Sequence, residues 1–478
     1  MVKNLLKIIG KALVLLLLVF LVIKLLEPLF TESKTSVWTD FYAQEKNSVD
    51  ILILGNSHAN AGIDNNIIEA NLNAKIASLA TRGQNIYQTY YCALEAYNYQ
   101  TPKVLIIENF LFYERLTLNE FIEQDPSTND YLKRYLTFEG KKIDRVKIAE
   151  AKELFNGSVI ENLSPTIKKH DQWTNFDKIR KRIYDRDIQK GNTGITVMDS
   201  QKIKAYENHI KFDLSTYNVL PDEEDALNKI IQLAKDKGTE QVILLTIPFY
   251  KGYRDRIDYN SLRDPLQKFG QENENVTYLD LNSQFHDWDN TYFSNDPVGY
   301  NQHLNYKGAI IVSNYLSKFL NSKFPVSNKS VPDKTIEYFL YNKIKNESSA
   351  TGQKMIGNLE TISGSKELSV TLTQGKSHLV FEGWMAIENV LSNAQEMYIG
   401  LVDKNNFVYI SSFYQFKPKI RNDVTTYFKK ENGLYDQSGY IININTNLLE
   451  KGNYELYMIL KTEDDIVLKK SFKNVEIN

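Results

Sequence analysis

Short apolar runs alternate with amphipathic segments through most of the first 320 residues of the chain. The apolar runs stand at residues 51–54, 74–79, 103–109, 241–246 and 276–281. Segments with the apolar spacing of a helix stand at residues 65–72, 86–97, 224–237, 259–269 and 308–319. Runs that are apolar throughout are typical of strands buried on both faces, and their alternation with helices is typical of parallel sheets. The pattern therefore predicts an α/β fold built on a doubly wound parallel sheet.

The pattern changes between about residues 111 and 215, which are charged, aromatic and helical only in patches. Two such patches are Arg145–Leu154 and Trp173–Tyr184. An insertion at this point of an α/β fold often forms a cap that selects substrates. Plain scaffolding between sheet strands would show the same pattern, so both interpretations stay open.

The amino-terminal segment Leu5–Leu26 is apolar and long enough to span a bilayer as a helix. Lys3, Lys7 and Lys11 precede its most apolar part, and no run of small residues follows that a signal peptidase would cleave. We therefore expect residues 1–30 to form a cytoplasmic stub and a transmembrane signal anchor. The lysines place the amino terminus inside the cell and the rest of the chain outside it, with localisation at the cell membrane.

Beyond residue 366 the apolar period changes from about four to two. Residues 326–365 are rich in Ser, Asn and Gly apart from one helical stretch at 335–345, and they are expected to be a linker. Short alternating segments separated by Gly, Asn and Asp turns then continue to the end of the chain. This spacing predicts a β-sandwich over residues 366–478, which is a candidate carbohydrate-binding domain.

Composition excludes several classes of protein. The net charge of −2 gives no global electrostatic basis for binding nucleic acid. Cys92 is the sole cysteine, so an intramolecular disulfide and a cysteine-rich zinc site are excluded. Neither standard glycine-rich phosphate loop is present, and the His286–Asp289 cluster resembles a solvated turn more than a metal site. We expect no cofactor and no metal.

Ser57 stands directly after the first apolar run, in the sequence Gly55-Asn56-Ser57-His58. This position lies beyond the carboxyl end of a buried strand, where open α/β sheets bind ligands. A serine there can be a nucleophile if a base reaches it and backbone amides face the oxyanion. An ordinary loop in which Ser57 or Asn60 caps the next helix is the alternative.

Of the six histidines, His303 has the most suggestive position, in the polar sequence Asn301-Gln302-His303-Leu304-Asn305 just before the last helix of the sheet domain. With His303 included, four short blocks occur in order along the chain. They are Gly-Asn-Ser-His after the first strand, Gly83 after the second, Asn109 after the third, and His-Leu-Asn before the last helix. Together they resemble the SGNH/GDSL hydrolase family over residues 49–320. The resemblance is closest to its membrane-anchored branch, which includes the alginate O-acetylation proteins and the D-alanine transfer protein of teichoic acids.

The resemblance implies a three-layer SGNH-type domain over residues 31–325 and a role for each conserved position of the motif. Ser57 would be the nucleophile and His303 the general base. The amides of Ser57 and Gly83 and the side chain of Asn109 would form the oxyanion hole. The usual Gly-x-Asn context is absent at Asn109, so Asn85 is the substitute candidate.

The chain departs from the family pattern at the acid, which normally stands three residues before the histidine. Tyr300 holds that position here. Asp296 is the nearest upstream carboxylate and would orient His303 if the loop folds back, whereas Asp287 and Asp289 are more distant. A Ser–His dyad and a decayed site are the other two possibilities, because loss of the acid costs several orders of magnitude in rate.

The function implied by the resemblance is that of an extracytoplasmic O-acyltransferase, most simply an O-acetyltransferase. Ser57 would pass an acyl group to a hydroxyl of a cell-surface polysaccharide or teichoic acid. A multi-pass membrane O-acyltransferase would be the partner that delivers the acyl group. An esterase with the same residues is one alternative. A non-catalytic glycan-binding assembly protein is another, with Trp384, Tyr409, Phe413, Tyr414 and Arg421 available for sugar contact.

Overall fold

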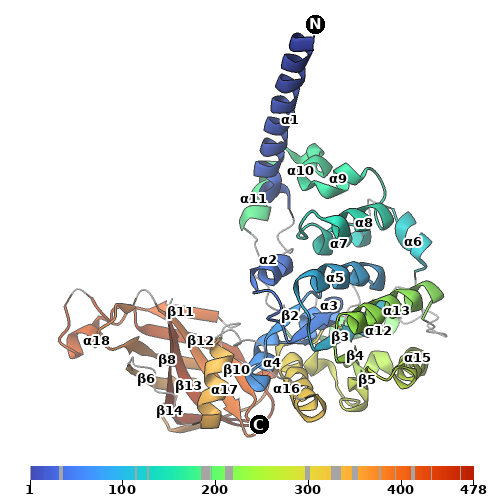
Figure 1. The fold of residues 1–478 in the computed structure, drawn as a ribbon. Coiled ribbons are helices and arrows are strands. Elements are labelled where there is room, and N and C mark those ends of the chain that lie inside the picture. Colours follow the sequence, from blue (N-terminus) through green and yellow to red (C-terminus); the bar gives the residue numbers. More distant parts are fainter. Residues whose placement is uncertain are drawn as a thin grey trace.

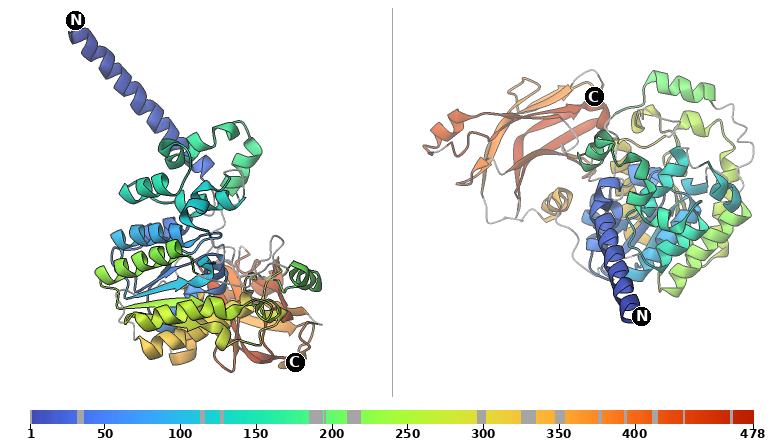
Figure 2. Two further views of the ribbon diagram at one scale, coloured as in Figure 1. Left: turned by 90° about the vertical axis from the view of Figure 1, so that its right-hand side faces the viewer. Right: turned by 90° about the horizontal axis from the view of Figure 1, so that it is seen from above.

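The structure is a computed structural model in which two globular parts are joined to a long amino-terminal helix (Figures 1 and 2). It describes the whole chain except residues 1, 32–35, 113–115, 126–128, 185–193, 195, 210–218, 296–301, 325–334, 347–353, 376–377, 393–394, 411–414, 432 and 463–464.

Five parallel strands form the central sheet in the order β2–β1–β3–β4–β5. They are β1 (Ile51–Leu54), β2 (Ile76–Ser78), β3 (Val104–Glu108), β4 (Gln241–Thr246) and β5 (Val276–Asp280). The chain winds from β1 outward to β2 and then returns past β1 to β3. In this strand order ligands bind at the carboxyl ends of β1 and β3, where the winding reverses. The predicted α/β fold with a parallel sheet is confirmed.

Helices cover both faces of this sheet because successive strand residues point to opposite sides. Leu52 and Leu54 pack into one apolar layer, and Ile51 and Ile53 pack into the other. The first layer contains α2 (Ser36–Ala43), α5 (Ile86–Tyr99), α13 (Pro221–Asp236) and α15 (Tyr259–Glu272). The second contains α3 (Ser57–Gly62), α4 (Asn65–Leu72), α14 (Lys251–Arg254) and α16 (Tyr306–Lys323).

The segment between β3 and α13 is mostly helical in its described residues. It contains α6 (Leu118–Glu123), α7 (Asn129–Phe138), α8 (Arg145–Glu153), α9 (Val159–Leu163), α10 (Pro165–Lys168), α11 (Phe176–Tyr184) and α12 (Ser200–His209). The helical patches expected at 145–154 and 173–184 correspond to α8 and α11. Helices α7–α10 lie between α5 and the amino-terminal helix (Figures 1 and 2).

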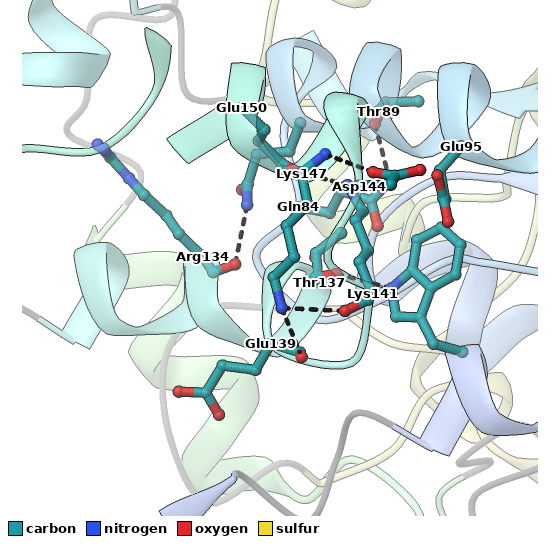
Figure 3. Close-up of polar contacts among 12 residues, drawn as sticks. Gln84, Thr89, Glu95, Arg134, Thr137, Glu139, Lys141, Asp144, Lys147 and Glu150 are labelled. Atoms are coloured by element: carbon teal, nitrogen blue, oxygen red, sulfur yellow. Dashed lines mark hydrogen bonds and ion pairs between the residues drawn. The ribbon is translucent and has the colours of Figure 1, made fainter. Parts of the chain in front are cut away.

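A buried polar cluster fastens α7 and α8 to the sheet part (Figure 3). Lys141 Nζ lies 2.6 Å from Glu150 Oε2, and both side chains are fully buried. Lys147 Nζ donates to the carbonyl oxygens of Glu139 and Lys141, each at 3.0 Å. Trp38 of α2 donates its indole N–H to the Thr137 carbonyl at 2.7 Å. The Lys141 and Lys147 contacts join the end of α7 to α8, and the Trp38 hydrogen bond connects this cluster to α2.

The amino-terminal helix α1 (Val2–Phe30) is the one described helix long and apolar enough to cross a membrane. The qualifying segment is Leu5–Phe30, with a mean hydropathy of 2.7, and its side chains are exposed from Leu5 to Val22. The expected apolar helix is therefore present, and its carboxyl-terminal end packs on α10 and α11.

The chain after residue 354 forms two further sheets, which are largely antiparallel and share one apolar core. The first has the order β10–β9–β13–β14–β7 and the second the order β11–β12–β8–β6. Their strands are β6 (Met355–Ile362), β7 (Ser369–Leu372), β8 (His378–Ile387), β9 (Glu396–Asp403), β10 (Val408–Ile410), β11 (Gln415–Lys419), β12 (Gly439–Asn445), β13 (Gly452–Lys461) and β14 (Ile466–Ile477). A short helix, α18 (Asn422–Tyr427), follows β11.

The expectation of a linker over 326–365 was wrong at its end, because β6 lies inside this range and pairs with β8. The helix expected at 335–345 is α17 (Ile336–Asn346). It joins the two globular parts, since Tyr341 donates its hydroxyl to Asn314 of α16 at 2.8 Å. Tyr306 accepts a hydrogen bond from the Ile410 amide at 2.7 Å across the same contact.

Candidate active site

Ser57 is the first residue of α3 and follows β1 by a two-residue turn. The side chain of Asn56 caps this helix, accepting from the His58 amide at 2.9 Å. Asp64 caps the following helix α4. Neither Ser57 nor Asn60 is the cap of these helices, so the alternative that makes Ser57 a capping residue does not hold. Its hydroxyl stands at the carboxyl end of β1 with 7% of the residue exposed.

Gly55 allows the turn before Ser57 to approach β3 closely. A Cβ at this position would lie 2.8 Å from Glu108 Cβ and 2.9 Å from Ala59 Cβ, and both distances are shorter than a van der Waals contact between carbon atoms. Any larger residue at position 55 would push the Ser57 turn away from β3.

His303 lies beside this turn although it is distant in sequence. Its ring centroid is 5.1 Å from that of His58, with the rings nearly perpendicular, and 7% of the residue is exposed. The Ser294 amide donates to the His303 carbonyl at 2.9 Å, and Asn305 caps α16 two residues later. The structure therefore brings Ser57 and His303, the two residues selected from the sequence, to the same edge of the sheet.

His58 is an additional member of this site to which the sequence reasoning gave no role. Its ring stacks on Phe110 at 3.6 Å, and neither ring nitrogen has a hydrogen-bond partner among the described residues. Burial and then the neighbouring His303 lower its pKa well below the usual value for histidine. His58 is therefore a neutral ring that packs against the site. Its place next to Ser57 was the available sequence signal.

Glu108, the last residue of β3, was also missed. It is fully buried, and its carboxylate accepts from the amide of Phe110 at 2.8 Å and from the amide of Asn56. Burial, partly offset by these two hydrogen bonds, raises the pKa of Glu108 from 4.5 to about 8. The Glu108 carboxyl thus connects the Ser57 turn with Phe110, the residue that stacks on His58. The sequence signal that could have identified Glu108 is a carboxylate at the end of an otherwise apolar strand.

The two asparagines proposed for the oxyanion hole have other hydrogen bonds. Asn109 is fully buried and donates Nδ2 to the Thr246 hydroxyl at 3.2 Å, at the end of β4. Asn85 caps α5 by accepting from the Gln88 amide at 3.0 Å. Asn109 therefore lies at the expected strand end with one of its two amide hydrogens engaged, and Asn85 has a structural role.

Gly83 lies in the loop between β2 and α5 with φ of +70°, a conformation that favours glycine. Helix α7 covers this loop, because a Cβ on Gly83 would lie 2.5 Å from Lys133 Cδ. Thr81 and Thr137 share a hydrogen bond of 2.5 Å, and Gln88 donates to the Arg134 carbonyl at 3.0 Å. The insert thus packs on the second strand-end loop.

The other end of the insert runs along the loop that carries His303. Met198 donates its amide to Phe293 at 2.9 Å, and Tyr306 donates its amide to Gly194 at 2.8 Å. Asn295 donates its amide to Thr196 at 2.9 Å. Both ends of the insert therefore border strand-end loops at the candidate site.

The carboxylate expected to orient His303 falls outside the described part of the chain. Asp296 and Tyr300 both lie in residues 296–301. The two more distant candidates have local partners, since Asp287 pairs with Lys251 and His286, and Asp289 accepts from the amide and hydroxyl of Thr291. Within the described residues, no group of three His, Cys, Asp or Glu side chains could hold a metal ion.

The C-terminal residues considered for sugar contact are divided among several environments. Tyr409 is fully buried in the core, and Arg421 forms ion pairs with Glu360 and Asp423. Trp384 packs edge-on against Phe428. Phe413 and Tyr414 lie outside the described residues.

The raised pKa of Glu108 predicts a pH-dependent stability. Because the folded protein holds this proton up to about pH 8 and the unfolded chain releases it near 4.5, stability should fall as pH rises through this range. Glu108→Gln, which keeps the acceptor oxygen, should lose this part of the pH dependence and exceed wild type at pH 8 by a few kcal/mol, on the order of 3–5. Urea unfolding of both proteins at pH 5 and pH 8 measures the difference. An equal pH dependence in the two proteins would contradict the assignment.

Comparison with known proteins does not assign the chain to a family. No protein-family model matches the sequence, and no curated protein matches it significantly. Among solved structures, a gut microbial diltiazem-metabolizing enzyme is similar at 10% identity and a TM-score of 0.19, with 77% of this chain and 71% of that chain covered. An endo-β-1,4-mannanase from Thermotoga petrophila is similar at 8% identity and a TM-score of 0.15, with 92% and 99% covered. These scores carry no argument about fold or function.

Proposed function

We propose that the protein is an extracytoplasmic O-acyltransferase of SGNH type that uses Ser57 as its nucleophile and His303 as its general base. The observation that supports the proposal is the contact of the His303 ring with His58, the residue after Ser57, at the carboxyl end of β1, where Ser57 and His303 are each 7% exposed. A buried serine next to a histidine is the arrangement that nucleophilic acyl transfer requires.

In the proposed reaction His303 accepts the Ser57 Oγ proton while Oγ bonds to the acyl carbonyl carbon. The bond from this carbon to the donor's leaving atom breaks, and His303 gives that atom its proton. A sugar hydroxyl then attacks the carbonyl carbon of the Ser57 ester, and its proton passes to His303. The bond from this carbon to Ser57 Oγ breaks, which releases the acylated sugar, and His303 returns the proton to Oγ. The amides of Ser57 and Gly83 and the remaining amide hydrogen of Asn109 would stabilise the oxyanion. Asp296 would orient His303.

Low exposure of the site favours transfer over hydrolysis. An acyl-enzyme that water reaches easily would be hydrolysed before a sugar could bind. Ser57 and His303 are shielded, and the insert borders the surrounding loops. An esterase is the alternative function, since it would share every step up to the acyl-enzyme. A non-catalytic assembly protein that binds glycans remains the third candidate.

The remaining assignments depend on the same proposal. The acceptor would be a cell-surface polysaccharide or teichoic acid, and a multi-pass membrane O-acyltransferase would supply the acyl group. The chain would be a single-pass protein of the cell membrane with its amino terminus in the cytoplasm. The C-terminal sheets, a β-sandwich in this proposal, would bind carbohydrate.

Labelling of the serine tests the proposal. A fluorophosphonate probe should modify the full chain in detergent, and Ser57→Ala should abolish the labelling because the nucleophile is gone. The matched control is Ser317→Ala, which removes another buried hydroxyl, one that donates to the Ser313 carbonyl within α16. It should label like wild type.

A smaller reagent covers the case in which the insert excludes the probe. p-Nitrophenyl acetate should leave an acetyl group on Ser57, detected by peptide mass. A wild-type protein that gains neither the phosphonate nor the acetyl group would overturn the proposal. Acyl transfer to a sugar acceptor, compared with release of free acetate, then separates the transferase from the esterase.

A further inference from the structure

The outer part of α1 is attached to the insert at a fixed place. From Leu5 to Val22 the side chains of this helix are exposed, and from Ile23 to Phe30 the helix packs on other elements. Thr166 of α10 donates its hydroxyl to the Ile23 carbonyl at 3.3 Å. Lys169 donates to the Phe30 carbonyl at 2.7 Å and also pairs with Glu139 at 2.9 Å.

The apolar segment of α1 extends through this attachment. The stretch that qualifies as a membrane span ends at Phe30, whereas contact with the insert already begins at Ile23. A hydrocarbon core of about 30 Å takes up about 20 residues of helix. Placing the apolar stretch in the bilayer therefore puts α10 and its neighbours at the outer membrane–water boundary.

Three large apolar side chains are exposed at this end of the molecule. Ile160 of α9 is 69% exposed, Trp173 is 51% exposed, and Phe176 at the start of α11 is 77% exposed. Helices α9, α10 and α11 form the end of the globular part from which α1 emerges (Figures 1 and 2). We call these three residues the apolar rim.

The apolar rim is connected directly to the attachment of α1. Trp173 donates its indole N–H to the Thr166 carbonyl at 2.8 Å, and the hydroxyl of Thr166 contacts α1. A tryptophan with its N–H engaged and half its surface exposed is typical of a membrane–water interface. Net charge gives this end of the molecule little attraction to anionic lipids, because residues 159–180 contain four Lys and Arg residues and three Asp and Glu residues.

We propose that Ile160, Trp173 and Phe176 insert into the outer interface of the bilayer beside α1 and form a second membrane contact of the protein. The occupant of this surface is lipid, since the rim continues the apolar surface of a helix that itself spans the membrane. The contact holds the insert against the membrane and fixes the height of the sheet part above it. This proposal rests on α1 as a membrane span and is independent of acyl transfer.

The test uses the full chain in phosphatidylcholine nanodiscs with an environment-sensitive fluorophore on single cysteines. Cys92 is buried, and Cys92→Ala provides the background. Ile160→Cys and Phe176→Cys report on the rim. Phe472→Cys is the matched control, because Phe472 is 88% exposed on β14 in the C-terminal sheets, away from α1 (Figure 1).

At positions 160 and 176 we expect blue-shifted emission and quenching by nitroxide lipids, at a depth of about 5–10 Å into the headgroup–acyl boundary. Position 472 should be quenched by aqueous iodide only. The proposal is overturned if positions 160 and 176 behave like position 472, or if the chain does not enter nanodiscs. Shielding in native membranes but not in nanodiscs would also overturn it, since a protein would then cover the rim. None of these outcomes affects the labelling of Ser57.

Discussion

His303→Ala is expected to slow the acylation of Ser57 by several orders of magnitude, roughly 10⁴- to 10⁶-fold. Without an imidazole at this place, the serine hydroxyl has no group to take its proton as it attacks the acyl carbon. The fold should remain, because the backbone contacts of this loop do not involve the ring: Ser294 donates to the His303 carbonyl, and Asn305 caps α16.

His58 provides the matched control, since it is the other histidine next to Ser57. Its pKa is lowered by burial and by His303, and both of its ring nitrogens lack hydrogen-bond partners among the described residues. His58→Phe keeps an aromatic ring to stack on Phe110 and removes two buried nitrogens, which should be neutral or stabilising for folding. We expect it to be acylated within about tenfold of the wild-type rate, because no proton transfer depends on this ring.

The measurement is the burst of nitrophenolate released from p-nitrophenyl acetate in a single turnover. Circular dichroism of each variant checks that it is folded. The reverse result, with acylation lost in His58→Phe and kept in His303→Ala, would transfer the role of base to His58. Equal loss in both variants would mean that the two rings act together.

Lys141→Met is expected to destabilise the protein by about 3–5 kcal/mol. Lys141 and Glu150 are both fully buried and 2.6 Å apart, in the cluster that fastens α7 and α8 to the sheet part (Figure 3). The substitution leaves the Glu150 carboxylate without its ion-pair partner in a site that water does not reach. Desolvation of an unpaired charge is the dominant cost in such a variant.

Two further variants separate this effect from a general sensitivity to loss of lysine. Lys229→Met breaks the ion pair between Lys229 and Asp225 on α13. Both of these side chains are exposed, so the free energy of unfolding should change by less than about 1 kcal/mol. Lys141→Met combined with Glu150→Leu removes both buried charges and should recover most of the loss. Urea unfolding of the full chain in detergent, followed by tryptophan fluorescence, measures all three, since Trp38 lies 5.3 Å from Lys141. A double variant as unstable as Lys141→Met would show that packing, not charge, is lost.

The position of Ser57 follows from local sequence, whereas its surroundings do not. The apolar run 51–54 and the turn after it predict a buried strand with Ser57 at its end, and the structure has both. Glu108 at the end of β3 and Phe110 in the turn after it reach the same place. No spacing in the sequence indicates that Phe110 stacks on His58 or that Glu108 accepts from the Asn56 amide. These contacts depend on the pairing of β1 with β3, which is a long-range event.

One expectation failed, and the structure gives a second residue a role that the sequence did not indicate. β6 was assigned to a linker because its residues follow a Ser- and Gly-rich stretch, yet the strand is stabilised by pairing with β8. Asn85 was considered for the oxyanion hole, and in the structure its side chain caps α5. The local sequence permits several roles both for residues 355–362 and for Asn85. The neighbours that each contacts after folding determine which role it has.

The sequence by itself predicted the parallel sheet and the apolar helix α1. It also singled out Ser57 and His303 as the candidate nucleophile and base. Periodicity and apolar length suffice for these, because each is set by burial of residues close together in the chain. Tertiary structure alone decided that His303 lies beside His58 at the Ser57 turn, that burial raises the pKa of Glu108, and that the insert meets α1 next to Ile160, Trp173 and Phe176. Those features arise where segments distant in sequence pack together, and burial changes the chemistry of a side chain only after that packing has occurred.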